Sequence, residues 1–182
     1  MNRGNRRIIE STLALLELDP QHHVLEIGFG GGISLALAVE RLSGGVVSGI
    51  DVSKDMVRQA ERRFHREIEE GRVQIRFGDI SNLPFADAAF DRVFTINTIY
   101  FWPDASRGIS EIRRVLKNGG IAAVGLRSKG KMEKWPISKH GFRLYSAQEV
   151  ADLMSQTGFR EVRVDHRDQN HRLDQLVVLG TR

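Results

Sequence analysis

The chain contains no cysteine, which excludes disulfide bonds, thiolate metal ligands and a cysteine nucleophile. It also has no apolar run long enough to cross a membrane. Its first residues, MNRGNRRIIEST, lack the apolar core of a secretory signal. We therefore expect a cytoplasmic protein that does not associate with membranes.

The surplus of positive charge is small and dispersed. The net charge is +4 over 182 residues, and basic residues alternate with acidic ones, as in RQAERRFHREIEEGR. Such alternation is typical of a solvated helix face with ion pairs four residues apart. A nucleic-acid partner needs a more concentrated basic patch, so the charge pattern argues against one.

Apolar strands alternate with amphipathic helices along the chain. This alternation predicts a parallel sheet covered by helices on both faces. We expect a single-domain α/β fold with a doubly wound, Rossmann-like, mostly parallel seven-stranded sheet that ends in an antiparallel strand pair. The predicted helices are 5–18, 33–42, 53–70, 104–117 and 146–159, and the predicted strands are 24–27, 46–50, 73–79, 90–97, 121–127, 162–167 and 175–180. Asn118-Gly119-Gly120 is expected to stop the fourth helix, and 128–144 is the least regular stretch.

Two carboxylates bracket a glycine-rich loop between the first two predicted strands. The stretch VLEIGFGGGISLALAVE reads as a strand containing Glu26, a loop with Gly28, Gly30 and Gly32, and a helix. The next strand ends in Asp51. Glycines let a loop approach a ligand closely, and a carboxylate at the end of the next strand suits a ribose diol. The arrangement predicts an adenosine-containing cofactor.

The sign of the charge at Glu26 discriminates between cofactors. The glycines follow G-x-G-x-G rather than the G-x-G-x-x-G of a dinucleotide fingerprint. A carboxylate two residues before the first glycine would repel a pyrophosphate but suits a cationic or amino-bearing ligand. This favours S-adenosylmethionine, which carries an ammonium and a sulfonium, over NAD.

Motifs along most of the chain resemble those of the class I S-adenosylmethionine-dependent methyltransferases. VLEIGFGGG resembles their first motif, and GIDVSKDMVRQA resembles their second acidic strand end with its helix. FGDISNLPFADAAFDRVFTINTIYFWPD resembles their third and fourth strands. EIRRVLKNGGIAAV resembles their helix-turn-strand, with Asn118 where proline is more usual. The resemblance runs from about residue 20 to residue 182. We therefore expect one domain, with the N-terminal helix predicted from its apolar spacing in 1–20, a cofactor-binding core in 21–127 and a substrate-side segment with the strand pair in 128–182.

The resemblance implies a role for each matching position. Glycine-loop residues would lie beneath the methionine moiety, with Glu26 positioning water or the ammonium group, and Asp51 would accept hydrogen bonds from both ribose hydroxyls. Asp79 would accept from the adenine amino group, and the Ile80 amide would donate to the ring. The remaining implied cofactor contacts are Gly28, Phe29, Gly30 and Gly32 in the loop, Val52 and Met56 on adenine, and Asn97 through its carbonyl.

Each of these assignments has a structural alternative. The glycines fit a tight strand-helix turn, and Asp51 would also serve as the cap of the following helix. Asp79 and Asn97 are common turn residues, and Met56 is equally suited to the core.

The acceptor side is less clearly marked. Tyr100 and Phe101 would close the site near the sulfonium, and Trp102 and Trp135 are candidates for an apolar substrate wall, or for plain packing. No general base is identified. The catalytic candidates are Tyr100, His140 and Tyr145; the alternative reading is a surface histidine for His140 and a packed tyrosine for Tyr145. No spacing typical of a metal site is present. Segment 128–145, or a partner subunit, is expected to cover the site.

Three functions remain open at this point. NTIYFW lacks the N/D-P-P-Y/F signature that the resemblance associates with methylation of adenine or glutamine amides. Methyl transfer to a small molecule is therefore favoured. The alternatives are an RNA or protein methyltransferase, suggested by the basic N-terminal residues, and a non-catalytic cofactor-binding domain. The oligomeric state is open, with a homodimer as one option.

Overall fold

A seven-stranded mixed sheet organises the chain in the order β3-β2-β1-β4-β5-β7-β6. The computed structural model describes residues 3–133, 143–166 and 175–182. Strands β1 to β5 are parallel, β7 is antiparallel to β5, and β6 is antiparallel to β7. The strands are β1 (His23–Ile27), β2 (Val46–Asp51), β3 (Val73–Phe77), β4 (Phe90–Ile96), β5 (Leu116–Arg127), β6 (Arg160–Asp165) and β7 (Gln175–Thr181). The predicted fold class is confirmed.

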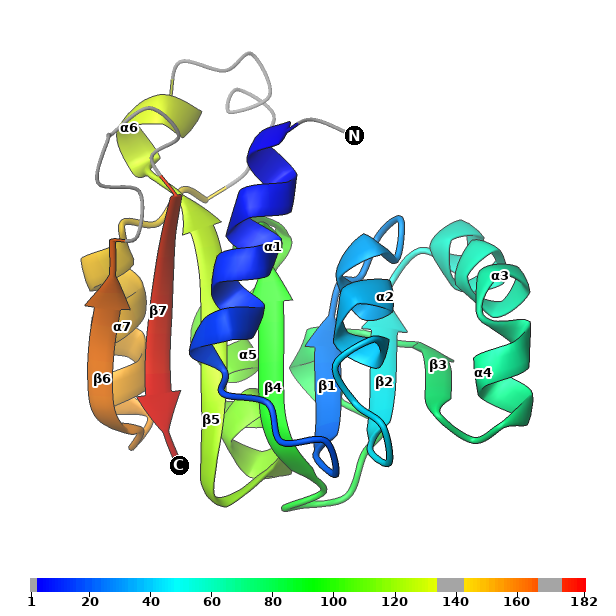
Figure 1. The fold of residues 1–182 in the computed structure, drawn as a ribbon. Helices are drawn as coiled ribbons and strands as arrows, with labels where there is room; N and C mark the ends of the chain where they lie inside the picture. Colours follow the sequence, from blue (N-terminus) through cyan, green and yellow to red (C-terminus); the bar gives the residue numbers. More distant parts are fainter. Residues whose placement is uncertain (1–2, 134–142, 167–174) are drawn as a thin grey trace.

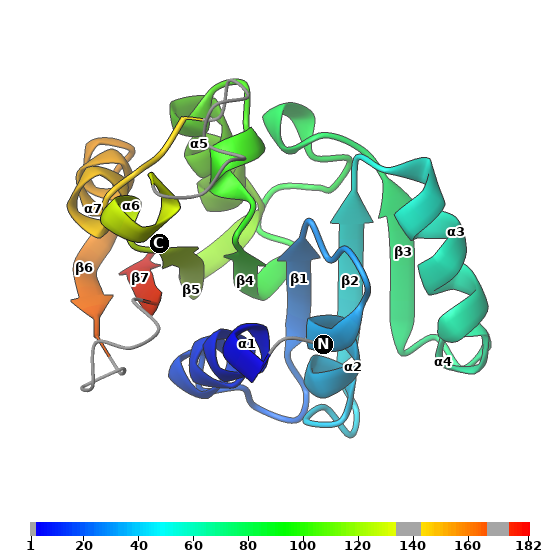
Figure 2. The same cartoon turned by 90° about the horizontal axis from the view of Figure 1, so that it is seen from above.

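Helices cover both faces of this sheet. Helices α1 and α2 lie on one face and α5 and α7 on the other (Figures 1 and 2). The helices are α1 (Arg3–Leu15), α2 (Ile33–Val39), α3 (Lys54–Arg63), α4 (His65–Glu69), α5 (Ala105–Val115), α6 (Lys129–Met132) and α7 (Ala147–Gln156), and the 3-10 turns are η1 (Ile80–Asn82) and η2 (Ile99–Phe101). Among the described residues, we find no helix with the length and hydrophobicity that a membrane span requires.

The core consists of two apolar clusters separated by the sheet. Successive side chains of a strand point to opposite faces. Val24 and Phe94 accordingly join the cluster with α1, α2 and α3, whereas Leu25 and Val93 join the cluster with α5 and α7. Because both faces are buried, the central strands are apolar at consecutive positions, as expected of parallel strands.

Several predicted helix and strand ends differ from the structure by a few residues, and two predictions are wrong in a larger way. The helix predicted over 53–70 is divided into α3 and α4 at Phe64, which is buried in the core. Asn118-Gly119-Gly120 lies inside β5 instead of stopping the preceding helix, which already ends at Val115. The physical reason is long-range pairing: the Gly119 amide donates to the Arg182 carbonyl, and the Arg182 amide donates to the Gly120 carbonyl.

Candidate active site

A cavity of about 410 Å³ lies at the carboxyl ends of β1, β2 and β4. The strand order reverses between β1 and β4, and ligands of open α/β sheets bind at such a point. Many of the residues predicted from the sequence are brought together here. The cavity is lined by Ile27, Gly28, Gly30, Ile50, Asp51, Val52, Ser53, Met56, Gly78, Asp79, Ile80, Ile96, Asn97, Thr98, Phe101, Trp102 and Pro103.

The glycine loop requires glycine at its first position. Gly28 has a φ of +72°, and a Cβ atom there would lie 2.5 Å from Cγ2 of Thr98. Its amide donates to the Ile50 carbonyl at 2.7 Å, which ties the loop to β2. Positive φ and close approach are both accessible only to glycine at low cost. The tight-turn reading is therefore correct for Gly28, and it is compatible with a ligand contact because Gly28 also lines the cavity.

Asp51 holds the glycine loop and the start of α3 at once. Its Oδ2 accepts from the Gly30 amide and its Oδ1 from the Ser53 amide, each at 2.9 Å. The cap of α3 is Ser53, whose hydroxyl accepts from the Met56 amide at 3.4 Å, so Asp51 is not the helix cap. A carboxylate oxygen has two lone pairs, and each oxygen retains one for a ligand hydroxyl.

Glu26 is a buried carboxyl group at the edge of an adjoining cavity of about 210 Å³. It is 1% exposed; its Oε1 accepts from the Ser34 hydroxyl, and its Oε2 has no hydrogen-bond partner. Burial raises the pKa of Glu26 to about 8, and the negative charge of Asp51 contributes to the rise. The carboxamide oxygen Oδ1 of Asn97 is likewise buried without a partner and lines the same cavity.

These two unpaired oxygens suit a cationic donor. A buried acceptor without a hydrogen bond is unfavourable, so the pair is satisfied best by a group with several N–H donors. The two cavities share Gly28, Gly30, Ile96 and Asn97, which makes them neighbouring compartments around the glycine loop. An elongated ligand with an ammonium at one end and a larger apolar group at the other matches this division.

The other end of the cavity is largely apolar. Val52 is 65% exposed at the rim, Ile80 is buried, and Met56 is half-buried; all three line the cavity. Asp79 also lines it and accepts from the Ser81 amide at 2.7 Å, so its turn-forming role and its place in the cavity coexist.

Asn97 occupies a strained backbone position at the end of β4. Its φ is +58°, and its amide donates to the Gly125 carbonyl at 2.8 Å. The turn reading of Asn97 therefore holds locally. Its predicted contact through the backbone carbonyl stays a prediction.

Of the remaining candidates, only some line the two cavities. Phe101, 57% exposed, and Trp102, 8% exposed, line the larger one, and Phe29 lines the smaller one while packing in the core. Gly32 lines neither: it is the N-cap of α2, with a φ of +68°.

Both tyrosines lie in the core instead of lining either cavity. The Tyr100 hydroxyl accepts from the Arg127 amide at 2.6 Å and donates to the Arg127 carbonyl at 3.2 Å. Burial raises the pKa of Tyr100 to about 12, so its hydroxyl is a poor base near neutral pH. Burial also raises the pKa of Tyr145, whose ring lies 5.0 Å from the Arg143 guanidinium. Trp135 and His140 lie outside the described residues.

The sequence analysis missed several residues of the site. Ser34 bonds Glu26, Thr98 faces Gly28, and Asn5 and Ile9 of α1 line the smaller cavity. A hydroxyl at the start of the helix that follows the glycine loop was a usable signal for Ser34. None existed for Asn5, because its place depends on how α1 packs. Over 3–133, 143–166 and 175–182, no group of three or more His, Asp or Glu side chains is arranged to hold a metal ion.

Comparison with known proteins identifies the family. A family model described as "Methyltransferase domain" matches residues 25–124, more than half of the 182-residue chain. The chain therefore belongs to the class I S-adenosylmethionine-dependent methyltransferases, as its motifs predicted, and S-adenosylmethionine is its cofactor.

Individual relatives are distant. The chain is 28% identical over 167 residues to the O-methyltransferase resE of Aspergillus sclerotiorum, a match covering 88% of this chain and 63% of the relative. It is 27% identical over 168 residues to the uncharacterized methyltransferase YdaC of Bacillus subtilis, covering 92% and 88%. The chain thus spans less than two thirds of the first relative's length and most of the second's.

A solved structure shares the fold over nearly the whole chain. The solved structure is described as a complex between the Haloferax volcanii Trm112 methyltransferase activator and the "putative methyltransferase". The present chain superposes on a chain of that complex with a TM-score of 0.85 at 19% identity, and the match covers 97% of this chain and 89% of that one. At this identity the likeness shows the fold alone.

Proposed function

We propose that the chain transfers a methyl group from S-adenosylmethionine to a small-molecule acceptor by in-line displacement. The observation that carries the proposal is the pair of buried, unpaired oxygens of Glu26 and Asn97 in a compartment next to the larger, mainly apolar cavity. That polarity matches the methionine and adenosine ends of the cofactor.

The proposed cofactor contacts follow the walls of the cavity. Glu26 and the Asn97 side chain hold the ammonium, Asp51 accepts from the ribose hydroxyls, and Asp79 accepts from the adenine amino group. These carboxylates supply charge-assisted hydrogen bonds, which are stronger than neutral ones. Val52, Met56 and Ile80 supply apolar contacts to the base.

The cofactor supplies an already activated methyl carbon, so the chain mainly orients and shields the reactants. The acceptor is proposed to enter beside Phe101 and Trp102, the aromatic residues of the cavity wall. Residues 134–142 of the 128–145 segment, which was expected to cover the site, lie outside the described residues. An apolar aromatic wall without the polar N/D-P-P-Y/F clamp suits a small, partly apolar acceptor. The word O-methyltransferase in the name of one relative fits such an acceptor and adds support from outside the chain.

Calorimetry with the purified full chain tests the cofactor. We expect binding of S-adenosylmethionine and S-adenosylhomocysteine, and no binding of NADH. A panel of small phenols, carboxylates and amines is then screened for acceptor-dependent release of S-adenosylhomocysteine, with total RNA as a separate sample. Turnover with a small molecule supports the proposal; turnover with RNA alone would replace the acceptor class. Cofactor binding without turnover on any sample would favour a non-catalytic domain.

A further inference from the structure

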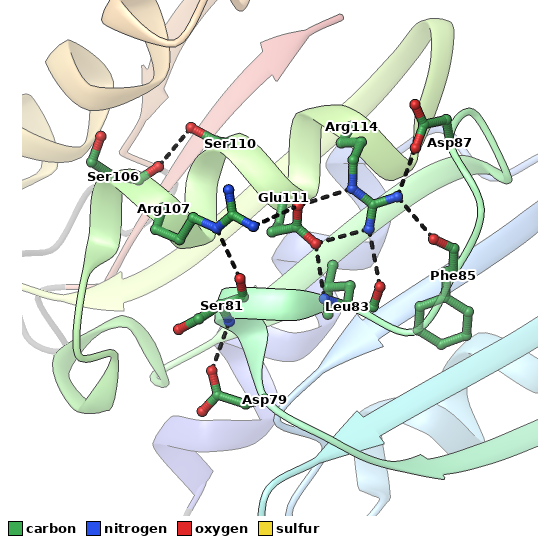
Figure 3. A network of polar contacts seen from close by, with 10 residues as sticks. All are labelled: Asp79, Ser81, Leu83, Phe85, Asp87, Ser106, Arg107, Ser110, Glu111 and Arg114. Carbon is green, nitrogen blue, oxygen red and sulfur yellow. Dashed lines mark hydrogen bonds and ion pairs between the residues drawn. The ribbon is translucent and has the colours of Figure 1, made fainter.

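The loop that carries Asp79 and Ile80 into the cavity is held in place from outside the site. Between β3 and β4, only the 3-10 turn η1 has regular structure. Side chains of α5 bind the main chain of this loop at several points (Figure 3). They belong to Arg107, Glu111 and Arg114.

Glu111 is the centre of these contacts. It is 4% exposed, and its Oε2 accepts from the Leu83 amide at 2.8 Å. The same carboxylate pairs with Arg114 at 2.8 Å and with Arg107 at 3.7 Å. The hydrogen bond from Arg114 is the main cause that lowers the pKa of Glu111, so the group is a buried carboxylate with its charge compensated.

The two arginines bind further main-chain groups of the loop. Arg107 donates to the Ser81 carbonyl at 2.9 Å, and the Ser81 amide in turn donates to Asp79. Arg114 donates to the Leu83 carbonyl at 3.0 Å and to the Phe85 carbonyl at 2.8 Å. Asp79 is therefore connected to Glu111 through the Ser81 backbone and Arg107, as Figure 3 shows.

Close packing reinforces this connection on the apolar side. A Cβ atom at Gly108 would lie 2.7 Å from the Trp102 ring and 3.0 Å from Ile80. Both neighbours line the larger cavity. Neighbouring residues of α5 therefore contact the apolar wall of the cavity and the loop that carries Asp79.

We propose that Glu111, with Arg107, is a positioning residue that sets the protein's selectivity for adenine by holding Asp79 and Ile80 at the cavity. This inference rests on the proposed function, because it assumes that Asp79 and Ile80 contact the base. Glu111 itself lines neither cavity and acts through the loop.

The test compares S-adenosylhomocysteine with S-inosylhomocysteine, in which hypoxanthine replaces adenine. Hypoxanthine presents an oxygen acceptor to Asp79 and a ring N–H to the Ile80 amide, so the wild-type chain should prefer the adenine ligand. Glu111→Gln keeps an acceptor for the Leu83 amide and removes the charge that holds both arginines. We expect Glu111→Gln to weaken S-adenosylhomocysteine binding by about fivefold. The ratio between the affinities for S-adenosylhomocysteine and S-inosylhomocysteine should become smaller than in the wild-type chain.

Further variants keep the inference testable. Arg107→Gln changes a half-exposed side chain and should narrow the preference in the same direction even if Glu111→Gln does not fold. The double variant Asp79→Asn, Glu111→Gln should lose less binding free energy for S-adenosylhomocysteine than the two single variants lose in sum, because both substitutions act on the contact of Asp79 with the base. Glu70→Gln is the matched control, since it removes a carboxylate from an exposed ion pair with Arg72 and should leave both affinities unchanged.

The outcomes separate the two proposals. A wild-type chain that binds neither ligand overturns the proposed function and the inference together. A wild-type chain that binds both ligands equally overturns the proposed contacts of Asp79 and Ile80 with adenine, and with them the inference, while the cofactor assignment stands. Folded Glu111→Gln and Arg107→Gln variants that keep wild-type affinity and preference overturn the inference alone.

Discussion

The amide of Gly30 donates a hydrogen bond of 2.9 Å to Oδ2 of Asp51. The carboxylate proposed to bind the ribose therefore also fixes the loop proposed to lie under the methionine moiety. Losing the charge at this position should affect both ends of the cofactor site.

Asp51→Asn tests this double role. One oxygen becomes an N–H₂ group, which must face the amide of either Gly30 or Ser53, so one of the two hydrogen bonds is lost. We expect the Kd for S-adenosylmethionine to rise at least about tenfold. Calorimetry measures the change, with Asp55→Asn on the exposed surface of α3 as the control. Equal affinities of the wild-type chain and Asp51→Asn would refute the role of Asp51.

Cofactor binding should depend on pH through Glu26. Its pKa is raised to about 8, so the free protein carries mostly protonated Glu26 at pH 7. An ammonium placed against it favours the ionised form, so binding at pH 7 should release a proton, and affinity should rise as the pH approaches 8. Calorimetry in buffers of different ionisation enthalpy counts the protons. Glu26→Gln should remove this release; the same proton count in that variant would show another group to be responsible.

Glu26 should also make the stability of the free protein depend on pH. Its folded pKa of about 8 lies above the ordinary value of 4.5, so the folded state binds the proton more tightly than the unfolded state. The stabilising contribution is full below about pH 4.5 and is lost as the pH rises through about 8. The Tm of the wild-type chain should therefore fall relative to the Tm of Glu26→Gln as the pH is raised from 5 to 8.5. A constant difference would contradict the raised pKa.

Gly28 and Gly30 provide a matched pair for the loop. Both have positive φ, but only at Gly28 would a Cβ atom meet another group, Cγ2 of Thr98, at 2.5 Å. We expect Gly28→Ala to lower the free energy of unfolding by about 2–4 kcal/mol and Gly30→Ala by about 1 kcal/mol. Denaturant unfolding measures both. Adding Thr98→Ser, which removes Cγ2, should recover part of the Gly28→Ala loss and none of the Gly30→Ala loss.

Tyr100→Phe separates a tyrosine with a structural role from one that contacts the cofactor. The substitution leaves the Arg127 amide without its partner, which should lower the free energy of unfolding by about 1–3 kcal/mol. Because the hydroxyl lines neither cavity, cofactor affinity should stay unchanged. Thermal unfolding and calorimetry measure the two quantities. Wild-type stability combined with weaker cofactor binding would place Tyr100 in the site after all.

Local sequence patterns determined the architecture and part of the site. Alternating strands and helices predicted the parallel sheet with its terminal antiparallel pair. Once the strands are parallel, Gly28 and Asp51, which directly follow or end neighbouring strands, must meet at one edge of the sheet. The backbone periods and the requirement for glycine at positive φ are properties of short segments, so the sequence alone was sufficient for them.

Tertiary packing decided which partner each side chain has. The family resemblance implied that Tyr100 lies near the sulfonium, but the Arg127 backbone holds its hydroxyl in the core. Similarly, the Glu111 carboxylate accepts a hydrogen bond from the Leu83 amide, 28 residues away in the sequence. Helix periodicity cannot indicate such a contact. Such contacts depend on how α5 and β5 dock against elements distant in the sequence. The sequence by itself therefore determined the fold and the carboxylates at the strand ends, and only the tertiary structure decided what holds them in place.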